Sequence, residues 1–186
     1  MKSYLSHLEC TYCHVTFSAD QPHRTCNECS KVLYPRYDLE SAKRTFNRDV
    51  LKHRPASMWR YFELLPIRDQ ANIVSLGEGF TPILKMKRLG DKIGCGDVYI
   101  KDESINPTAS FKARGMSTAV SKALELGLTR LTVPSAGNAG SALAAYAARA
   151  GVEAYVFVPK DATEATKKEV EITGVELTLV NGLITD

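Results

Sequence analysis

The sequence has no apolar run long enough to cross a membrane, and its first residues lack the apolar core of a signal peptide. It also lacks an excess of one charge: 24 basic and 21 acidic residues leave a formal net charge of +3, too small to indicate a nucleic-acid partner. We find no internal repeat and no low-complexity segment. We therefore expect a soluble, cytoplasmic globular protein with neither a membrane nor a nucleic-acid partner.

Cysteine is scarce except near the N-terminus, where four of the five cysteines form two Cys-x2-Cys pairs 12 residues apart. They are Cys10, Cys13, Cys26 and Cys29. In a reducing compartment such a cluster favours a metal over disulfides, and four thiolates complete a tetrahedral zinc site with no position left for water. We predict a structural zinc ribbon. A redox pair or metal-free thiols are the alternatives, and His14 or His23 could replace a cysteine, although four ligands are already present.

The chain divides into three parts by composition. We assign residues 1–37 to the zinc-ribbon module and residues 38–70 to a connecting segment of short helices or a strap. The aromatic residues of this segment are expected to pack against the main domain rather than to stack on nucleic acid. The pattern changes at residue 71, and we assign residues 71–186 to an α/β domain.

From residue 71 onward, short apolar runs alternate with helical patterns. The segments Leu131–Val133 and Ala154–Val158 are continuous apolar runs, as expected for parallel strands covered on both faces. Gly127, Gly151 and Gly174 lie just after the helical patterns, where glycine commonly ends a helix. The alternation predicts an open, mostly parallel sheet with flanking helices. We expect strands at 98–101, 129–133, 153–158 and 175–180, and helices at 111–126, 138–150 and 163–173.

Two loops that follow expected strands carry the chemistry. The first, Asn106-Pro-Thr-Ala-Ser-Phe-Lys-Ala-Arg114, places Lys112 near a helix N-terminus, where the helix dipole lowers the cost of the neutral amine that a nucleophile needs. The second, Ser135-Ala-Gly-Asn-Ala-Gly140, offers backbone N–H groups to a carboxylate or phosphate. A lysine beside an anion site suits a pyridoxal-phosphate enzyme of amino-acid metabolism. Taken alone, a lysine at a helix start is usually a solvated surface residue.

Four segments of the chain resemble the threonine synthases, which are fold-type II pyridoxal-phosphate enzymes with a tryptophan synthase β-like fold. They are Gly77-Glu-Gly-Phe-Thr-Pro82, Lys101-Asp-Glu103, Asn106-Pro-Thr-Ala-Ser-Phe-Lys112 and Ser135-Ala-Gly-Asn-Ala-Gly140. The resemblance covers about residues 71–186 and implies that they are the N-terminal part of a pyridoxal-phosphate-dependent α/β catalytic domain. The cysteine pairs look like the zinc knuckles that precede this domain in some prokaryotic members. Near these loops, Glu78, Asp102 and Glu103 are either functional carboxylates or simply solvated or capping ones.

The resemblance implies a role for each matching residue. Lys112 would form the Schiff base with pyridoxal 5'-phosphate, and Asn138 would bond the cofactor's 3′ oxygen. The substrate carboxylate would lie against the second loop, formed by Ser135, Ala136, Gly137, Asn138 and Ala139. The implied reaction converts a small amino-acid phosphate, O-phosphohomoserine, and water to threonine and phosphate. The full-length enzyme is expected to be a homo-oligomer.

Two positions depart from the family pattern. Ala109 stands where the family commonly has glycine, so a left-handed backbone there would cost on the order of 1 kcal/mol. Ala113 stands where the family often has aspartate beside the lysine, and its loss could change how substrate is handled.

The sequence also lacks the glycine-rich phosphate cup and the partner of the pyridine nitrogen, which lie in the second half of family members. We therefore expect an incomplete chain that is inactive alone. Another fold-type II enzyme, such as a cysteate synthase or a threonine dehydratase-like lyase, and a non-catalytic zinc-ribbon binding fragment remain alternatives.

Overall fold

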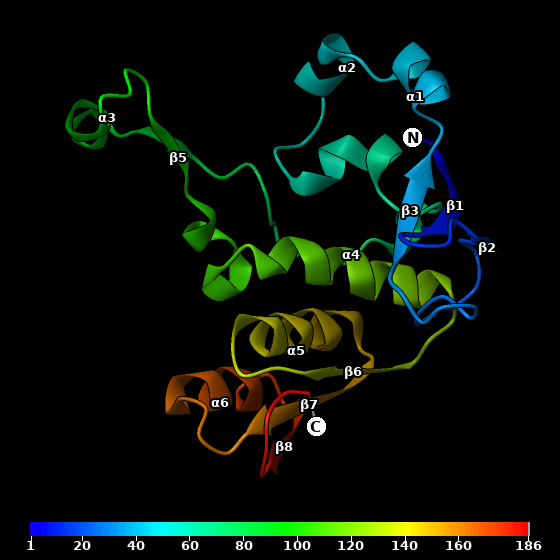
Figure 1. Cartoon of the computed structure of the whole chain (residues 1–186), viewed down its shortest axis with the longest axis vertical. Coiled ribbons are helices and arrows are strands. Elements are labelled where there is room, and N and C mark those ends of the chain that lie inside the picture. The colour runs from blue at the N-terminus through cyan, green and yellow to red at the C-terminus, as the bar shows by residue number, and fades with distance from the viewer. Residues whose placement is uncertain (186) are drawn as a thin grey trace. The chain divides into compact units, whose positions relative to one another are not determined.

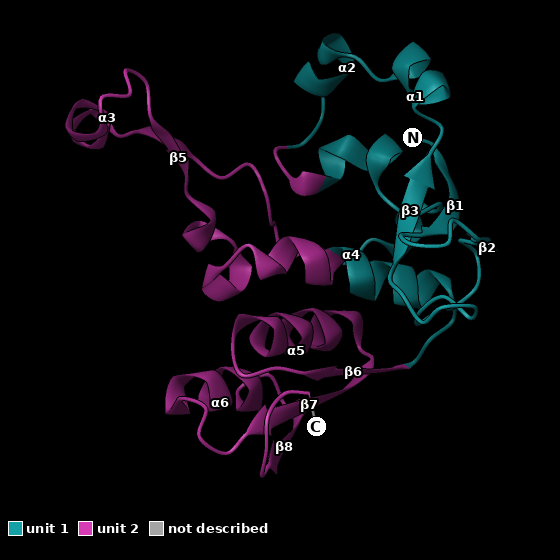
Figure 2. Cartoon of the chain, viewed as in Figure 1, with its two compact units in different colours: residues 1–55, 59–74, 118–129 teal, residues 56–58, 75–117, 130–186 magenta. Residues whose placement is uncertain are grey.

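The structure is a computed structural model that describes residues 1–185 and contains two compact units (Figure 2). Unit 1 consists of residues 1–55, 59–74 and 118–129, and unit 2 of residues 56–58, 75–117 and 130–186. Helix α4 (Lys112–Glu125) contributes to both, since its residues through Ser117 belong to unit 2 and the rest to unit 1. Within the described residues, no helix has the length and apolar character needed to cross a bilayer.

Unit 1 is built on a small antiparallel sheet with the strand order β2-β1-β3. Its strands are β1 (Leu5–Cys10), β2 (Thr16–Ser18) and β3 (Leu33–Tyr37). Short helices follow, mostly in residues 38–70, the segment predicted to link the ribbon to the main domain. They are α1 (Leu39–Thr45), α2 (Arg48–Lys52), η1 (Met58–Leu64) and η2 (Gln70–Asn72). Asp38 and Asn47 start the first two by accepting backbone N–H groups. Trp59, Phe62 and Ile67 are buried in unit 1, whereas Tyr61 is 43% exposed.

Unit 2 contains the predicted α/β layer (Figure 1). Its three strands are parallel in the order β6-β7-β8: β6 (Arg130–Pro134), β7 (Glu153–Pro159) and β8 (Glu176–Val180). Helices α5 (Asn138–Ala150) and α6 (Glu164–Glu171) contact each other and the sheet. Their common core contains Ala144, Val156, Val158 and Val170. The predicted parallel α/β architecture is confirmed.

One predicted strand does not belong to that layer. Strand β5 (Tyr99–Lys101) pairs antiparallel with β4 (Ile83–Lys85) in a separate two-stranded sheet, with α3 (Lys87–Ile93) between them in the chain. All three residues of each strand are exposed, so neither strand has an apolar face to bury in a parallel sheet. The chain then continues into the short turns η3 (Glu103–Ile105) and η4 (Pro107–Ala109) rather than directly into a crossover helix.

The expected cover on both faces of the parallel strands is also not found among the described residues. Ala154, Val156 and Val158 are buried on one face of β7, whereas Phe157 on the other face is 38% exposed. Leu179 of β8 is 44% exposed. Helices α5 and α6 contact one another, which places them on one face and leaves the second without a helix of its own in this part of the chain.

Candidate active site and metal centre

Lys112 is the first residue of helix α4, as the sequence predicts. Its side chain is partly buried, and its Nζ lies 4.7 Å from the centre of the Phe111 ring. Among the described residues the amine has no hydrogen bond and no ion pair. An amine that is partly desolvated and free of a carboxylate partner is available for covalent chemistry.

The turn before Lys112 has an unusual backbone. Thr108 and Ala109 have φ values of 62° and 51°, in the left-handed region that favours glycine. The Ala109 N–H donates to the Asn106 carbonyl at 2.9 Å, which closes the turn. The structure therefore places Ala109 in the strained conformation anticipated from its replacement of glycine.

The Glu103 carboxylate holds this turn in place. It accepts hydrogen bonds from Arg114 Nε (2.6 Å) and Nη2 (2.7 Å), from Thr81 Oγ1 (2.6 Å) and from Asn106 Nδ2 (2.8 Å). Chiefly because of the Arg114 guanidinium, the pKa of Glu103 is lowered to about 2. Arg114 follows Lys112 by two residues, so Glu103 fixes the first turn of α4 from outside. Asp102, in contrast, only caps the next turn by accepting the Ser104 N–H at 3.0 Å.

The second predicted loop opens helix α5. Ser135 Oγ accepts the N–H groups of Gly137 (3.2 Å) and Gly140 (3.0 Å), which shapes the loop. Asn138 is the first residue of the helix and is exposed, and the N–H groups of Asn138 and Ala139 have no acceptor among the described residues. Gly140 allows close approach to the sheet, because a Cβ there would lie 2.9 Å from Val156 Cγ1. The loop thus presents free donors at a helix N-terminus.

The two loops are neighbours in unit 2, since η4 lies against α5. Two hydroxyls of the first loop, Thr108 Oγ1 and Ser110 Oγ, are buried without a hydrogen-bond partner. Buried unpaired hydroxyls are uncommon in native proteins and indicate a missing partner. With the free amine of Lys112 and the free N–H groups of α5, they fit a polar ligand such as pyridoxal phosphate at this place.

Glu78 is neither solvated nor a simple surface cap, as one interpretation of the sequence allowed. Its side chain is fully buried and accepts hydrogen bonds from Ser117 Oγ (2.7 Å) and Tyr146 OH (2.6 Å). The sequence alone does not reveal Ser117 and Tyr146 as partners of Glu78, because a serine and a tyrosine inside helical patterns belong to no motif.

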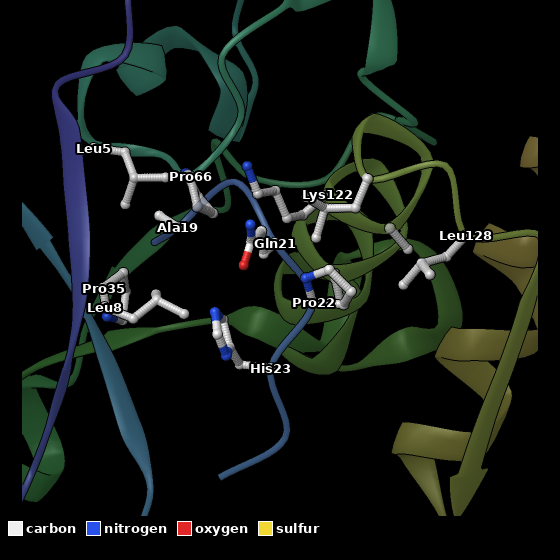
Figure 3. Close-up of a pocket in the computed structure, with 13 residues that line it drawn as sticks. Leu5, Leu8, Ala19, Gln21, Pro22, His23, Pro35, Pro66, Lys122 and Leu128 are labelled. Carbon is white, nitrogen blue, oxygen red and sulfur yellow. The ribbon is translucent and has the colours of Figure 1, made fainter. Parts of the chain in front are cut away.

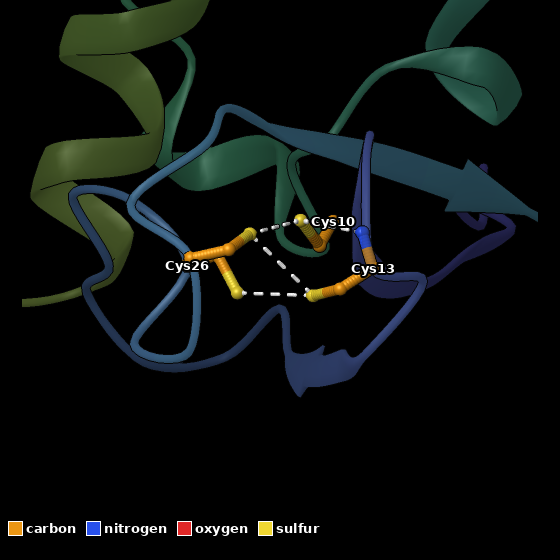
Figure 4. Close-up of side chains that lie close together, drawn as sticks. Cys10, Cys13 and Cys26 are labelled. Carbon is orange, nitrogen blue, oxygen red and sulfur yellow. Dashed lines mark hydrogen bonds between the residues drawn. The ribbon is translucent and has the colours of Figure 1, made fainter.

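The four predicted zinc ligands form one cluster in unit 1 (Figure 4). All four Sγ atoms lie within 4.8 Å of one another, with Cys10 and Cys29 3.4 Å apart and Cys13 and Cys26 3.5 Å apart. A tetrahedral site with Zn–S bonds of ~2.3 Å separates its sulfurs by about 3.8 Å, so the thiols fit zinc. Outside this cluster, His14 bonds Glu9 and His23 bonds the Ser18 carbonyl.

Unit 1 also has an apolar hollow of about 320 Å³ that sequence analysis did not anticipate (Figure 3). Its walls come from the ribbon strands, the Ala19–His23 loop and the second half of α4. Lys122 reaches its edge but is already paired with Glu125 at 2.6 Å. The hollow therefore offers packing surface and no unpaired cation for a charged ligand.

Comparison with known proteins defines the class. The model of the family described as "Pyridoxal-phosphate dependent enzyme" matches residues 74–186. This chain therefore belongs to that family. Among curated proteins it is similar to the threonine synthase of Methanosarcina acetivorans, with 42% identity over 153 residues, 82% of this chain and 37% of that protein. The threonine synthase of Methanocaldococcus jannaschii is 40% identical over 151 residues, 81% of this chain and 37% of that protein.

Solved structures agree on the fold. An aspartate racemase that depends on pyridoxal 5'-phosphate superposes with a TM-score of 0.52 and 35% identity, covering 54% of this chain and 33% of that one. An O-ureido-L-serine synthase superposes with a TM-score of 0.51 and 30% identity, covering 55% and 33%. A diaminopropionate ammonia lyase from Escherichia coli, at 19% identity and a TM-score of 0.56, supports the fold alone. The chain spans a little over a third of the curated relatives it matches.

Proposed function

We propose that this chain forms the lysine-bearing part of a pyridoxal-phosphate-dependent lyase of the threonine synthase type. The reaction would convert O-phosphohomoserine and water to threonine and phosphate. The observation that carries the proposal is the unpaired amine of Lys112 at the start of α4, in a loop that lies against the helix opened by Asn138. The similarity to curated threonine synthases supports this substrate over others.

Each residue then has a task. Pyridoxal phosphate, when bound, supplies an electron sink for the charge that develops at the substrate Cα. Lys112 would hold the cofactor, and its amine would move protons between the substrate Cα and the later carbons. The Asn138 amide would bond the cofactor's 3′ oxygen. The loop formed by Ser135 to Ala139 would hold the substrate carboxylate, with the N–H groups of Asn138 and Ala139 as its free donors.

We also propose that this activity needs residues beyond those described here, and that the complete enzyme is a homo-oligomer. The match to only 37% of the relatives' length supports the first of these points. In this proposal residues 1–37 form the zinc ribbon, residues 38–70 connect it, and residues 71–186 belong to the catalytic domain.

The assignment of Lys112 is tested on the full-length, cofactor-loaded protein. Borohydride reduction followed by peptide mapping is expected to place the pyridoxyl label on Lys112. Lys112→Ala is expected to abolish turnover of O-phosphohomoserine, whereas Asn138→Ala is expected to weaken it. As a control, Lys101→Ala removes another lysine of the same region, which contacts the Thr81 carbonyl and not the predicted ligand groups. A label on a different lysine would exclude the assignment.

The metal proposal has its own test. We expect about one zinc per chain by elemental analysis, as for one closed tetrahedral site. Cys10→Ser and Cys29→Ser should lose most of the metal and destabilise unit 1. Cys95→Ser changes the exposed cysteine outside the cluster and should keep the full amount. Full metal retention in both cluster variants would contradict the ribbon.

A different substrate within the same class is the second candidate. It is favoured by Ala113, which stands beside the lysine where the family often has aspartate, and by the structural neighbours that act on other amino acids. Turnover assays with O-phosphohomoserine, L-threonine and L-serine would separate the candidates. Phosphate release from O-phosphohomoserine alone supports threonine synthesis.

A further inference from the structure

A single buried carboxylate joins three segments of unit 2. Glu78 is 0% exposed and accepts hydrogen bonds from Ser75 Oγ (3.0 Å) and the Leu76 N–H (3.0 Å) in its own loop. It also accepts hydrogen bonds from Ser117 Oγ (2.7 Å) and Tyr146 OH (2.6 Å). The carboxylate therefore links its loop to helix α4 through Ser117 and to helix α5 through Tyr146.

These two helices are the ones that open at the candidate active site. Ser117 lies five residues after Lys112 on α4, and Tyr146 lies eight residues after Asn138 on α5. Because a helix is a stiff element, fixing it one or two turns from its start also fixes the residues at its start. One carboxylate thus acts on both sides of the site.

The electrostatics favour an ionised Glu78 carboxylate as the link between α4 and α5. Burial raises the pKa of Glu78, but the hydrogen bonds from Tyr146, Ser117 and the Leu76 N–H outweigh it and leave the pKa lowered. Burial and the neighbouring carboxylate also raise the pKa of Tyr146, which keeps its hydroxyl a donor. Hydrogen bonds to a carboxylate are short and stronger than neutral ones, as the 2.6 and 2.7 Å distances illustrate.

The loop that carries Glu78 is itself fixed. The Glu78 carbonyl accepts the Met58 N–H at 2.8 Å, and Gly79 has a φ of 98°. A Cβ at Gly79 would lie 2.5 Å from the Met58 nitrogen, so only glycine fits there. The Gly79 N–H in turn donates to Asn106 Oδ1 at 3.0 Å, at the start of the strained turn before Lys112.

We infer that Glu78 is a positioning residue that sets the N-termini of α4 and α5 relative to each other, and so aligns the lysine side of the active site with the anion-binding side. This inference rests on the proposed function for the meaning of the two sides. The contacts that carry it lie within unit 2 and need no ligand.

Because Ser117 donates to Glu78 from α4 and Tyr146 donates from α5, each helix can be disturbed separately. Ser117→Ala removes the bond to α4 and leaves the bond to α5, and Tyr146→Phe does the reverse. Each change leaves a buried carboxylate with one donor fewer, which is enough to change a local equilibrium about tenfold. If Glu78 only stabilised the fold, both variants would have the same effect on both helices.

The first experiment is hydrogen exchange on the full-length protein without cofactor. Ser117→Ala is expected to speed exchange about tenfold at the hydrogen-bonded N–H groups of Ala113 and Arg114, beside Lys112 in α4. Tyr146→Phe is expected to do so at the Gly140 N–H, which is hydrogen-bonded near the start of α5. Glu78→Gln is expected to speed both. Tyr155→Phe is the matched control, because it removes a tyrosine–glutamate bond of 3.2 Å at an exposed site of β7. Equal acceleration of both helices by each single variant, or none, would overturn the inference.

The second experiment uses the cofactor-loaded protein. We expect Ser117→Ala to raise the dissociation constant of pyridoxal phosphate about tenfold with little change in KM. Tyr146→Phe should raise KM for O-phosphohomoserine and, because α5 also carries Asn138, shift the cofactor's absorbance spectrum without a comparable loss of cofactor affinity. Both effects appearing together in each variant would contradict the inference. Absence of turnover in the unmodified protein would instead contradict the proposed function. The exchange experiment would still test whether Glu78 positions α4 and α5.

Discussion

Ala109 has a strained backbone in the turn that precedes Lys112. Its φ of 51° follows the φ of 62° at Thr108, and together they turn the chain so that α4 can begin at Lys112. A left-handed alanine is less stable than a left-handed glycine by roughly 1–2 kcal/mol, partly offset by the larger entropy that glycine loses on folding. The turn is held by the Glu103 and Asn106 contacts rather than by its own preference.

Ala109→Gly is therefore expected to stabilise the protein by about 0.5–1 kcal/mol, because glycine relieves the strain. The measurement is the midpoint of urea unfolding. Ala145→Gly, in the middle of α5, is the control and is expected to destabilise by about 1 kcal/mol, since glycine disfavours a helix interior. Equal losses in the two variants would show that Ala109 is not strained.

Glu103 makes stability depend on pH in a defined direction. Its pKa falls from the ordinary 4.5 to about 2 in the folded protein, mainly through Arg114. A carboxyl group with a lowered folded-state pKa adds stability above pH 4.5, and this contribution is lost as the pH falls toward 2. Glu103→Gln should therefore differ most from the unmodified protein at pH 5 to 7, and the difference should shrink toward pH 3. Denaturant midpoints across that range provide the measurement.

The control for this titration is Glu171→Gln, at the exposed end of α6, whose side chain has no partner among the described residues. This replacement removes one negative charge without breaking an ion pair, so it controls for the loss of charge alone. The comparison between variants also cancels any effect of acid on the cysteine cluster, which is common to all three proteins. A flat profile for Glu103→Gln would mean that the Arg114 pair contributes nothing to folding.

Residues that belong to a loop motif could be found from the sequence, and residues that support the loop from elsewhere could not. Lys112, Asn138 and the four cysteines lie in short local patterns. Glu78 was visible in a motif, but its partners Ser117 and Tyr146 are 39 and 68 positions away in the chain. Only the folded chain brings such residues together, so their shared role needs the structure.

Among the helices and strands, those that bury an apolar face were the ones whose bounds the sequence predicted well. Helix α5 has the predicted bounds of 138–150, and β6, β7 and β8 lie within a residue of the prediction at each end. Their apolar faces and the glycines that end the preceding helices give a clear pattern. Strands β4 and β5 have three exposed residues each, and no periodicity in so short a segment reveals whether its partner is parallel or antiparallel.

For the whole molecule, the apolar surface of unit 2 leads to a prediction about association. Phe157, Leu179 and Leu183 are 38%, 44% and 70% exposed, and several residues near the active-site loops are also uncovered. Exposed apolar groups of this kind mark contact surfaces. The isolated chain is expected to self-associate, as measured by size-exclusion chromatography with light scattering. Leu179→Lys should reduce the association, while Leu39→Lys in α1 should not.

A monodisperse monomer at all concentrations, with cooperative unfolding, would contradict this prediction. It would mean that the exposed face of the sheet is tolerated in water. A protein that associates alone and becomes monodisperse when the remaining length of its relatives is supplied would support it.

The division of helix α4 between the units has a consequence for synthesis on the ribosome. Unit 1 begins at Met1, yet its last part, residues 118–129, is separated from residue 74 by much of unit 2. At about 5–20 residues per second, the 55 positions from residue 75 through 129 take roughly 3–11 s to make. During that interval the four cysteines have already been synthesised, whereas the surface of unit 1 that α4 covers is still open. Nascent-chain crosslinking is expected to find that surface reachable until residue 129 has emerged.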